Sequence, residues 1–173
     1  MGRFAHLVNT PNGMEGFRAL YHISRDISLR YCPLGGWHTL RNEGEVIIPM
    51  IAFIEGGIRL PMGRVTRDYL IAHKICPHQY PHNLFRVLGS ADIFNEQMGL
   101  DLTWYEVVWM YEFHLLADFG YYLKSRSSNV RLISCLSKSN KGRKDDYLII
   151  SGEWHDGLHC PTQEGAPGGI PQV

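Results

Sequence analysis

Four side chains that could bind a metal ion lie close together in the middle of the 173-residue sequence. They are His73, Cys76, His78 and His82. Imidazole and thiolate groups are the ligands that zinc prefers, but structural zinc sites usually show ligand pairs at recurring spacings. Here a single compact cluster is interrupted by Pro77 and Pro81. The pattern favours a polar, proline-rich connector between two helices over a metal centre, and we predict no metal ion and no other cofactor.

A second group of candidate residues forms a basic turn near the C-terminus. Its cations are Lys138, Lys141, Arg143 and Lys144. Clustered cations attract the phosphates of nucleic acids, so this turn could bind DNA or RNA. Asp145 and Asp146 follow directly and cancel half of the charge. A solvated loop is the favoured interpretation, because most runs of charged residues are simply exposed to water. A nucleic-acid-binding module that uses this turn stays as the alternative.

Motifs for catalysis are missing from the sequence. No G-x-S-x-G nucleophile motif accompanies the serines, and the glycine pairs lack the context of a dinucleotide site or a P-loop. Asp145-Asp146 is a turn pair without the further carboxylates of a two-metal centre. We therefore expect a protein that is not an enzyme.

Composition limits the class of protein. The formal net charge is zero, so no overall electrostatic bias draws the chain to nucleic acid or acidic membranes. With 45% hydrophobic and 20% charged residues, the chain can bury one core. Its four cysteines are widely spaced, which suggests reduced thiols. The longest apolar run, residues 46–54, contains Pro49 and falls short of the roughly 20 residues that span a bilayer. We expect a soluble intracellular protein, cytoplasmic or nuclear, without a membrane partner.

Three helices are predicted to follow one another in the centre of the chain. The first begins at Arg64 and ends before Pro77, and the second runs from about Asn83 to a stop at Gly99. The third begins at Thr103, where Thr103 and Glu106 have the spacing of a capping box, and it should end near residues 118–120. The first two are the best candidates to pack on the third.

Short strands are predicted on both sides of these helices. Residues 46–54 form a β-rich run, and residues 121–123, 130–133 and 147–150 are three further strand-like runs. The fold class is therefore α+β, with about three helices packed on a small antiparallel sheet or hairpin near the C-terminus. We predict a weakly structured arm over residues 1–44, with a short helix over residues 14–25, a domain over 45–155 and a disordered Gly/Pro tail over 156–173.

The third predicted helix is apolar on nearly every face, which is typical of a helix buried between layers or placed at an interface. Its candidate interaction residues, together with the segment that follows, are Trp104, Trp109, Tyr111 and Phe113. They suggest self-association or binding of another protein. Stacking on nucleic-acid bases is a further alternative, and its candidate residues are Trp104, Trp109, Tyr111, Tyr121 and Tyr122.

Four segments in a fixed order carry a family resemblance. They are GIRLP at residues 57–61, LTWYEVVWMYEF at 102–113, FGYYLKSR at 119–126 and SNKGRKDDYLIISGEW at 139–154. Together they resemble the plant gypsy-type transposon domain, a gag-like domain of plant proteins derived from LTR retrotransposons. The resemblance implies a structural or protein-interaction domain without catalytic residues. A zinc knuckle of the C-x₂-C-x₄-H-x₄-C type is missing from the sequence.

Overall fold

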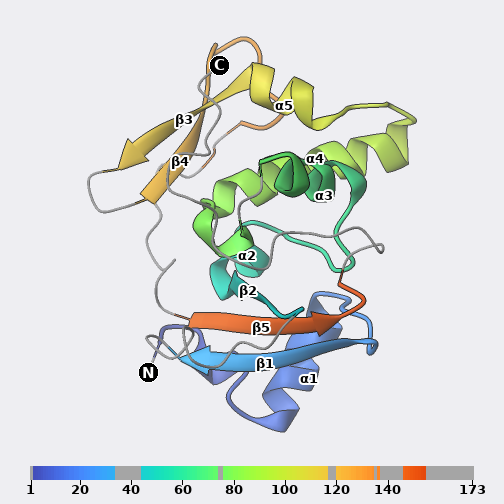
Figure 1. Ribbon diagram of the computed structural model, residues 1–173, viewed down its shortest axis with the longest axis vertical. Coiled ribbons are helices and arrows are strands. Elements are labelled where there is room, and N and C mark those ends of the chain that lie inside the picture. Colours follow the sequence, from blue (N-terminus) through green and yellow to red (C-terminus); the bar gives the residue numbers. More distant parts are fainter. Residues whose placement is uncertain are drawn as a thin grey trace.

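The computed structural model describes residues 2–33, 44–73, 76–116, 120–134, 136 and 146–154. Figure 1 shows three levels: a three-stranded sheet with α1 (Pro11–Leu20) on its outer side, a middle level of helices, and a two-stranded hairpin beside α5 (Trp104–Met110) at the other end. The middle level contains α2 (Met50–Ile54), α3 (Arg64–His73) and α4 (His82–Met98). The predicted α+β class is confirmed.

The three-stranded sheet is built around β5 (Asp146–Gly152), which lies between β1 (Ile27–Pro33) and β2 (Val46–Pro49) and is antiparallel to both. Residues 146–150 are all buried, in keeping with a central strand that has neighbours on both edges and both faces. A strand over residues 147–150 was predicted correctly, but its partners are strands from the first third of the chain instead of a neighbouring hairpin strand.

The N-terminal segment belongs to the core, which corrects the prediction of a weakly structured arm for residues 2–33. Thr10 caps α1 by accepting a hydrogen bond from the Gly13 amide. The helix begins at Pro11 and not near residue 14, and its Phe17 ring is buried, 5.6 Å from the ring of Phe53 in α2. These contacts join the first helix to the central layer.

A buried carboxylate also holds the N-terminal segment. Asp146 at the start of β5 accepts hydrogen bonds from the Phe4 amide at 2.6 Å and the Tyr31 hydroxyl at 2.7 Å. Burial and this hydrogen bond raise the pKa of Tyr31 to about 12. Short η1 (Ala5–Leu7) follows Phe4, and Ala5 is buried.

The predicted β-rich run over residues 46–54 is only half strand. It forms β2 and then, without a break, α2. Pro49 ends the strand and precedes the first helical residue with φ −60° and ψ 135°. Proline has no amide hydrogen to donate to the strand ladder, and its fixed φ suits the start of a helix. Pro49 therefore marks the change from strand to helix.

The predicted start of α3 at Arg64 and the predicted stop of α4 at Gly99 are confirmed. Gly99 terminates α4 with φ 64°, a left-handed conformation that glycine adopts without strain. The start of α4 is corrected, because Pro81 and not Asn83 precedes its first residue. Asn83 is buried and forms two hydrogen bonds with the backbone of Leu123 in β4. Its Nδ2 donates to the Leu123 carbonyl at 3.2 Å, and its Oδ1 accepts from the Leu123 amide at 3.3 Å. Short η2 (Pro77–Gln79) lies between the two helices.

The third predicted helix is shorter than expected. Helix α5 ends at Met110, and β3 (Tyr111–Leu116) then pairs with β4 (Gly120–Ser125). Tyr111 pairs with Ser125 of β4, and its hydroxyl accepts hydrogen bonds from the amides of Leu132 and Ile133. The helix therefore ends where contacts with later segments begin. The predicted strand at residues 130–133 is wrong, since the backbone there forms only an isolated bridge between Ser127 and Val130.

Helices α3, α4 and α5 contact one another, as predicted. In the part of the chain that the structure describes, no helix is both long and apolar enough to cross a membrane. The tail predicted for residues 156–173 lies outside the described residues.

Candidate functional site

Helix α5 is fixed at its first turn by a capping box. The Thr103 hydroxyl accepts a hydrogen bond from the Tyr105 amide, while the Glu106 carboxylate accepts one from the Thr103 amide at 2.7 Å. The capping box predicted from sequence is confirmed. Its effect is to satisfy amides that have no partner within the helix, and so to fix where α5 begins.

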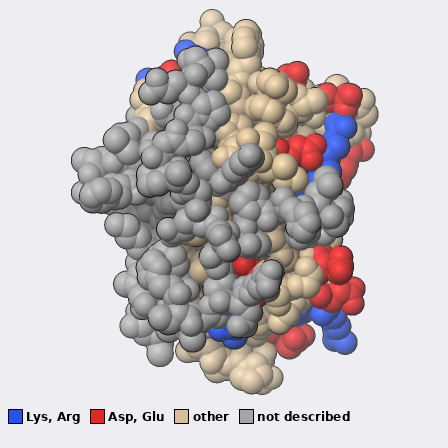
Figure 2. All heavy atoms as spheres, viewed as in Figure 1, with Lys and Arg blue, Asp and Glu red and all other residues tan. Residues whose placement is uncertain are grey.

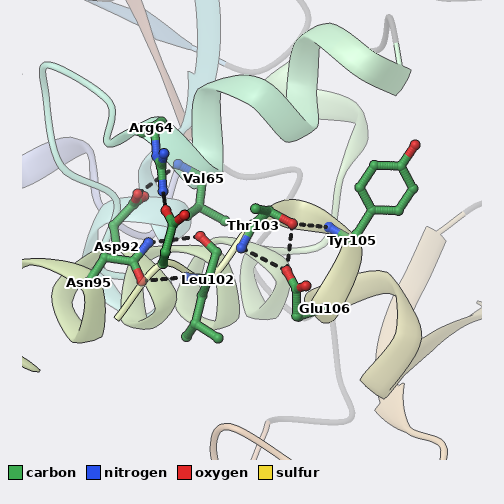
Figure 3. A network of polar contacts seen from close by, with 9 residues as sticks. Arg64, Val65, Asp92, Asn95, Leu102, Thr103, Tyr105 and Glu106 are labelled. Carbon is green, nitrogen blue, oxygen red and sulfur yellow. Dashed lines mark hydrogen bonds and ion pairs between the residues drawn. The ribbon is translucent and has the colours of Figure 1, made fainter. Parts of the chain in front are cut away.

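A polar network connects this turn to α3 and α4 (Figure 3). Asn95 of α4 exchanges two hydrogen bonds of 2.8 Å with the backbone of Leu102. Arg64, the first residue of α3, pairs with Asp101 at 2.5 Å. The segment between α4 and α5 is therefore tied to both preceding helices, and the direction of α5 is set by them.

The same network continues into the start of α3. Asp92 of α4 accepts hydrogen bonds from the Val65 amide at 2.7 Å, the Thr66 amide at 3.3 Å and the Thr66 hydroxyl at 2.8 Å. Asp92 thus caps α3 from a neighbouring helix. Burial raises the pKa of Asp92, and its hydrogen bonds from Val65 and Thr66 partly oppose that shift.

A small pocket of about 60 Å³ opens beside this cap. Gly63, Thr66 and Asp92 line it together with the exposed ion pair between Arg59 and Glu96. The amide and the hydroxyl of Thr66 both donate hydrogen bonds to the Asp92 carboxylate, so these groups are occupied within the protein. The pocket therefore contributes to the cap of α3, and its size suits about one or two water molecules.

The inner side of α5 packs on the core. Val107 is buried, and the half-buried Trp104 ring lies edge-on to the rings of Tyr69 at 6.5 Å and His73 at 5.2 Å. Trp104 therefore anchors α5 on α3.

The outer side of α5 is apolar and exposed. Tyr105 and Trp109, one helical turn apart, are 66% and 70% exposed. In Figure 3 the Tyr105 ring points away from the polar network. Its ring stacks on Trp104 with centroids 3.9 Å apart, so one face of the ring is covered and the ring is held in place. We call Tyr105, Glu106 and Trp109 the α5 outer face.

Glu106 adds a negative charge to the α5 outer face. Hydrogen bonds from the hydroxyl and the amide of Thr103 hold the pKa of its carboxyl below the usual value, so it is ionised at neutral pH. It is the only charged residue among residues 104–110. Ion pairs join Arg59 to Glu96 and Arg64 to Asp101, and Figure 2 shows basic and acidic side chains side by side along one edge of the molecule.

The predicted interaction residues divide into several groups in the structure. Trp109 is exposed, whereas Trp104 is mainly an anchor. Tyr111 is only 2% exposed and holds the backbone of residues 132–133, so a partner could not reach it without unfolding. The backbone of Phe113 lies in β3, and its side chain falls outside the described part of the structure.

Sequence reasoning missed Tyr105 and Glu106 as surface residues. The signal was present, because Tyr105 and Trp109 are four residues apart and must share a face of any helix that starts at Thr103. Glu106 was identified only as a capping residue. The missing information was which side of an almost uniformly apolar helix faces the core.

The four weak metal candidates are all buried but do not form a metal site. Among the described residues, no three His, Cys, Asp or Glu side chains are arranged to hold a metal ion. Nδ1 of His73 lies 2.9 Å from the Tyr69 carbonyl, and Nε2 of His82 lies 3.4 Å from the Glu55 carboxylate. Cys76 is buried and carries a reduced thiol. The segment connects α3 to α4, as predicted, and its polar side chain His78 is buried instead of exposed to water.

The predicted basic turn lies outside the described residues, with its cations Lys138, Lys141, Arg143 and Lys144. Nucleic-acid binding by this turn stays a prediction.

Comparisons with protein-family models, with curated proteins and with solved structures gave no match. The resemblance to the plant gypsy-type transposon domain therefore also stays a prediction.

Proposed function

We propose that this chain is a non-enzymatic protein-interaction domain that binds its partner through the α5 outer face. The observation that carries the proposal is the exposure of Tyr105 and Trp109 on a helix whose position is fixed by a capping box and by bonds to α3 and α4. Large aromatic side chains contribute strongly to protein interfaces when they are held in place before binding. A gag-like retrotransposon origin, which the sequence resemblance suggests, agrees with such a structural role.

Site-specific photocrosslinking tests the proposal. A benzoylphenylalanine is placed at Trp109 and, as the matched control, at Leu20 of α1, which is 69% exposed. We expect a discrete protein adduct from position 109 in cells that express the gene, identified by mass spectrometry and repeated with purified partner. Equal labelling from both positions, or none from position 109, would refute the proposal.

Self-association is the simplest form of the proposal. Size-exclusion chromatography with light scattering across a micromolar concentration series would reveal a dimer, and Trp109→Ser should then restore the monomer. A wild-type monomer at every concentration would remove self-association and leave only a different protein as partner.

A further inference from the structure

We infer that the α5 outer face recognises an arginine or lysine side chain of a basic peptide segment, held between the aromatic rings and the carboxylate. This inference rests on the proposed function and names the chemistry of the partner. It depends on three features of α5: the exposed rings of Tyr105 and Trp109, the Glu106 carboxylate three residues before Trp109 and so next to it on the helix surface, and the absence of a lysine or arginine in residues 104–110.

The rings offer a surface to which cations bind. Tyr105 and Trp109 lie four residues apart on one face and are 66% and 70% exposed. The negative face of an aromatic ring attracts ammonium and guanidinium groups, and tryptophan does so best. Because Tyr105 is stacked on Trp104 at 3.9 Å, one face of its ring is covered and the other lies open.

The carboxylate selects the sign of the charge. Glu106 follows Tyr105 directly, and its Oε2 is held by the amide and the hydroxyl of Thr103. Glu106 is an exposed residue and its carboxylate is ionised, so an incoming cation can reach it and pair with it. No lysine or arginine lies in residues 104–110 to compete for it.

The same features argue against a phosphate-rich partner at this face. A carboxylate beside the rings repels the phosphates of nucleic acid and of anionic lipids. The neighbouring Asp101 is 84% exposed in its side chain and adds a second acidic group, although Arg64 pairs with it. Complementary charge therefore favours a basic peptide over base stacking or a membrane surface.

Fluorescence anisotropy on the full chain tests the inference. The probe is a fluorescein-labelled 12-residue peptide of alternating glycine with arginine and lysine, and the control peptide carries glutamine at every basic position. We expect binding of the basic peptide only, weakened by added salt because the contact includes an exposed ion pair.

Three variants assign the binding to the face. Trp109→Leu keeps an apolar side chain but removes the indole ring, and it should weaken binding by about 3- to 10-fold. Glu106→Gln keeps a residue that suits a capping box, and it should weaken binding by about 3- to 5-fold. Leu20→Ala on α1 should bind as the wild type does. Circular dichroism checks that each variant keeps its fold.

The outcomes separate the inference from the proposed function. If the basic peptide does not bind, or binds Trp109→Leu and Glu106→Gln as tightly as the wild type, the inference is refuted. Protein adducts from position 109 would then still support an interaction face, with a partner of different chemistry. A dimer that Trp109→Leu disrupts, without peptide binding, would assign the face to a second copy of the chain and also refute the inference.

Discussion

The contact between Gly63 and Asp92 is the most sensitive point of the polar network, and a double-mutant cycle can measure it. A methyl group added at Gly63 would overlap the Asp92 carboxylate. That carboxylate holds the Val65 amide and both polar groups of Thr66 at the start of α3. Gly63→Ala must therefore displace the cap, although the backbone of Gly63 is not in the left-handed region.

The size of the effect follows from the bonds that are lost. Asp92→Ala removes a helix cap and leaves buried donors without an acceptor, which together cost about 2–4 kcal/mol in the free energy of unfolding. Gly63→Ala alone should cost nearly as much, because it breaks the same bonds by displacement. In the double variant these bonds are lost only once, and the new methyl group occupies the space that the carboxylate has left. We therefore expect the two substitutions to fall short of additivity by about 2 kcal/mol.

Urea denaturation at pH 7 provides the assay. The transition can be followed by tryptophan fluorescence, because Trp154 is only 1% exposed in the folded protein, with circular dichroism as the second probe. Gly16→Ala in α1 is the matched control, since no atom lies within 4 Å of the added methyl group. It should stabilise by about 0.5–1 kcal/mol and combine additively with Asp92→Ala. Additive costs for Gly63→Ala and Asp92→Ala would refute the close contact.

Three further predictions concern the core. Asp146→Asn leaves one oxygen for two donors, the buried amide of Phe4 and the partly buried hydroxyl of Tyr31, and should lower the free energy of unfolding by about 1–3 kcal/mol in urea denaturation; an unchanged midpoint would contradict it. Burial lowers the pKa of His73 below 6.5, so as the pH falls this imidazole is protonated in the unfolded chain before it is protonated in the folded one. Its stabilising contribution should be complete above pH 6.5 and decline as the pH falls through the folded-state pKa, by at most about 1.4 kcal/mol per pH unit, and His73→Gln should reduce this slope between pH 5 and 7. Gly56→Ala places a methyl group 2.5 and 2.7 Å from backbone carbonyl oxygens in α2 and α4, and should lower the thermal midpoint by several degrees, with about 2–4 kcal/mol lost; a midpoint equal to the wild type would show that the two helices can separate.

The parts of the fold that could be predicted are those that depend on local chemistry. The capping box at Thr103 and the left-handed stop at Gly99 are set by residues a few positions apart, and both were correct. The switch from β2 to α2 at Pro49 was missed, because an apolar run of this length is compatible with strand and helix. In the same way, the end of α5 at Met110 depends on pairing with β4, which no local pattern reports.

The candidate site was predictable only in part. Trp109 was named from the apolar character of its helix, but the same argument also named Tyr111, which the structure buries. The sequence shows that residues 105 and 109 share a face, yet the contacts of Trp104 with Tyr69 and His73 decide which face turns outward. Those contacts join segments about 30 residues apart and become visible only in the folded chain.

The central position of β5 has a consequence for how the chain acquires its fold during synthesis. Its register places Gly152 opposite Ile27 and Ile150 opposite Val46, so neither outer strand of that sheet has a partner until the ribosome has released residues 146–152. Apolar residues of β1 and β2 must wait through the synthesis of all the helices between them and β5. Contacts between such distant residues slow folding and leave hydrophobic strands open to aggregation in the meantime. We therefore expect a nascent chain of this protein to bind a chaperone through β1 and β2 before β5 emerges.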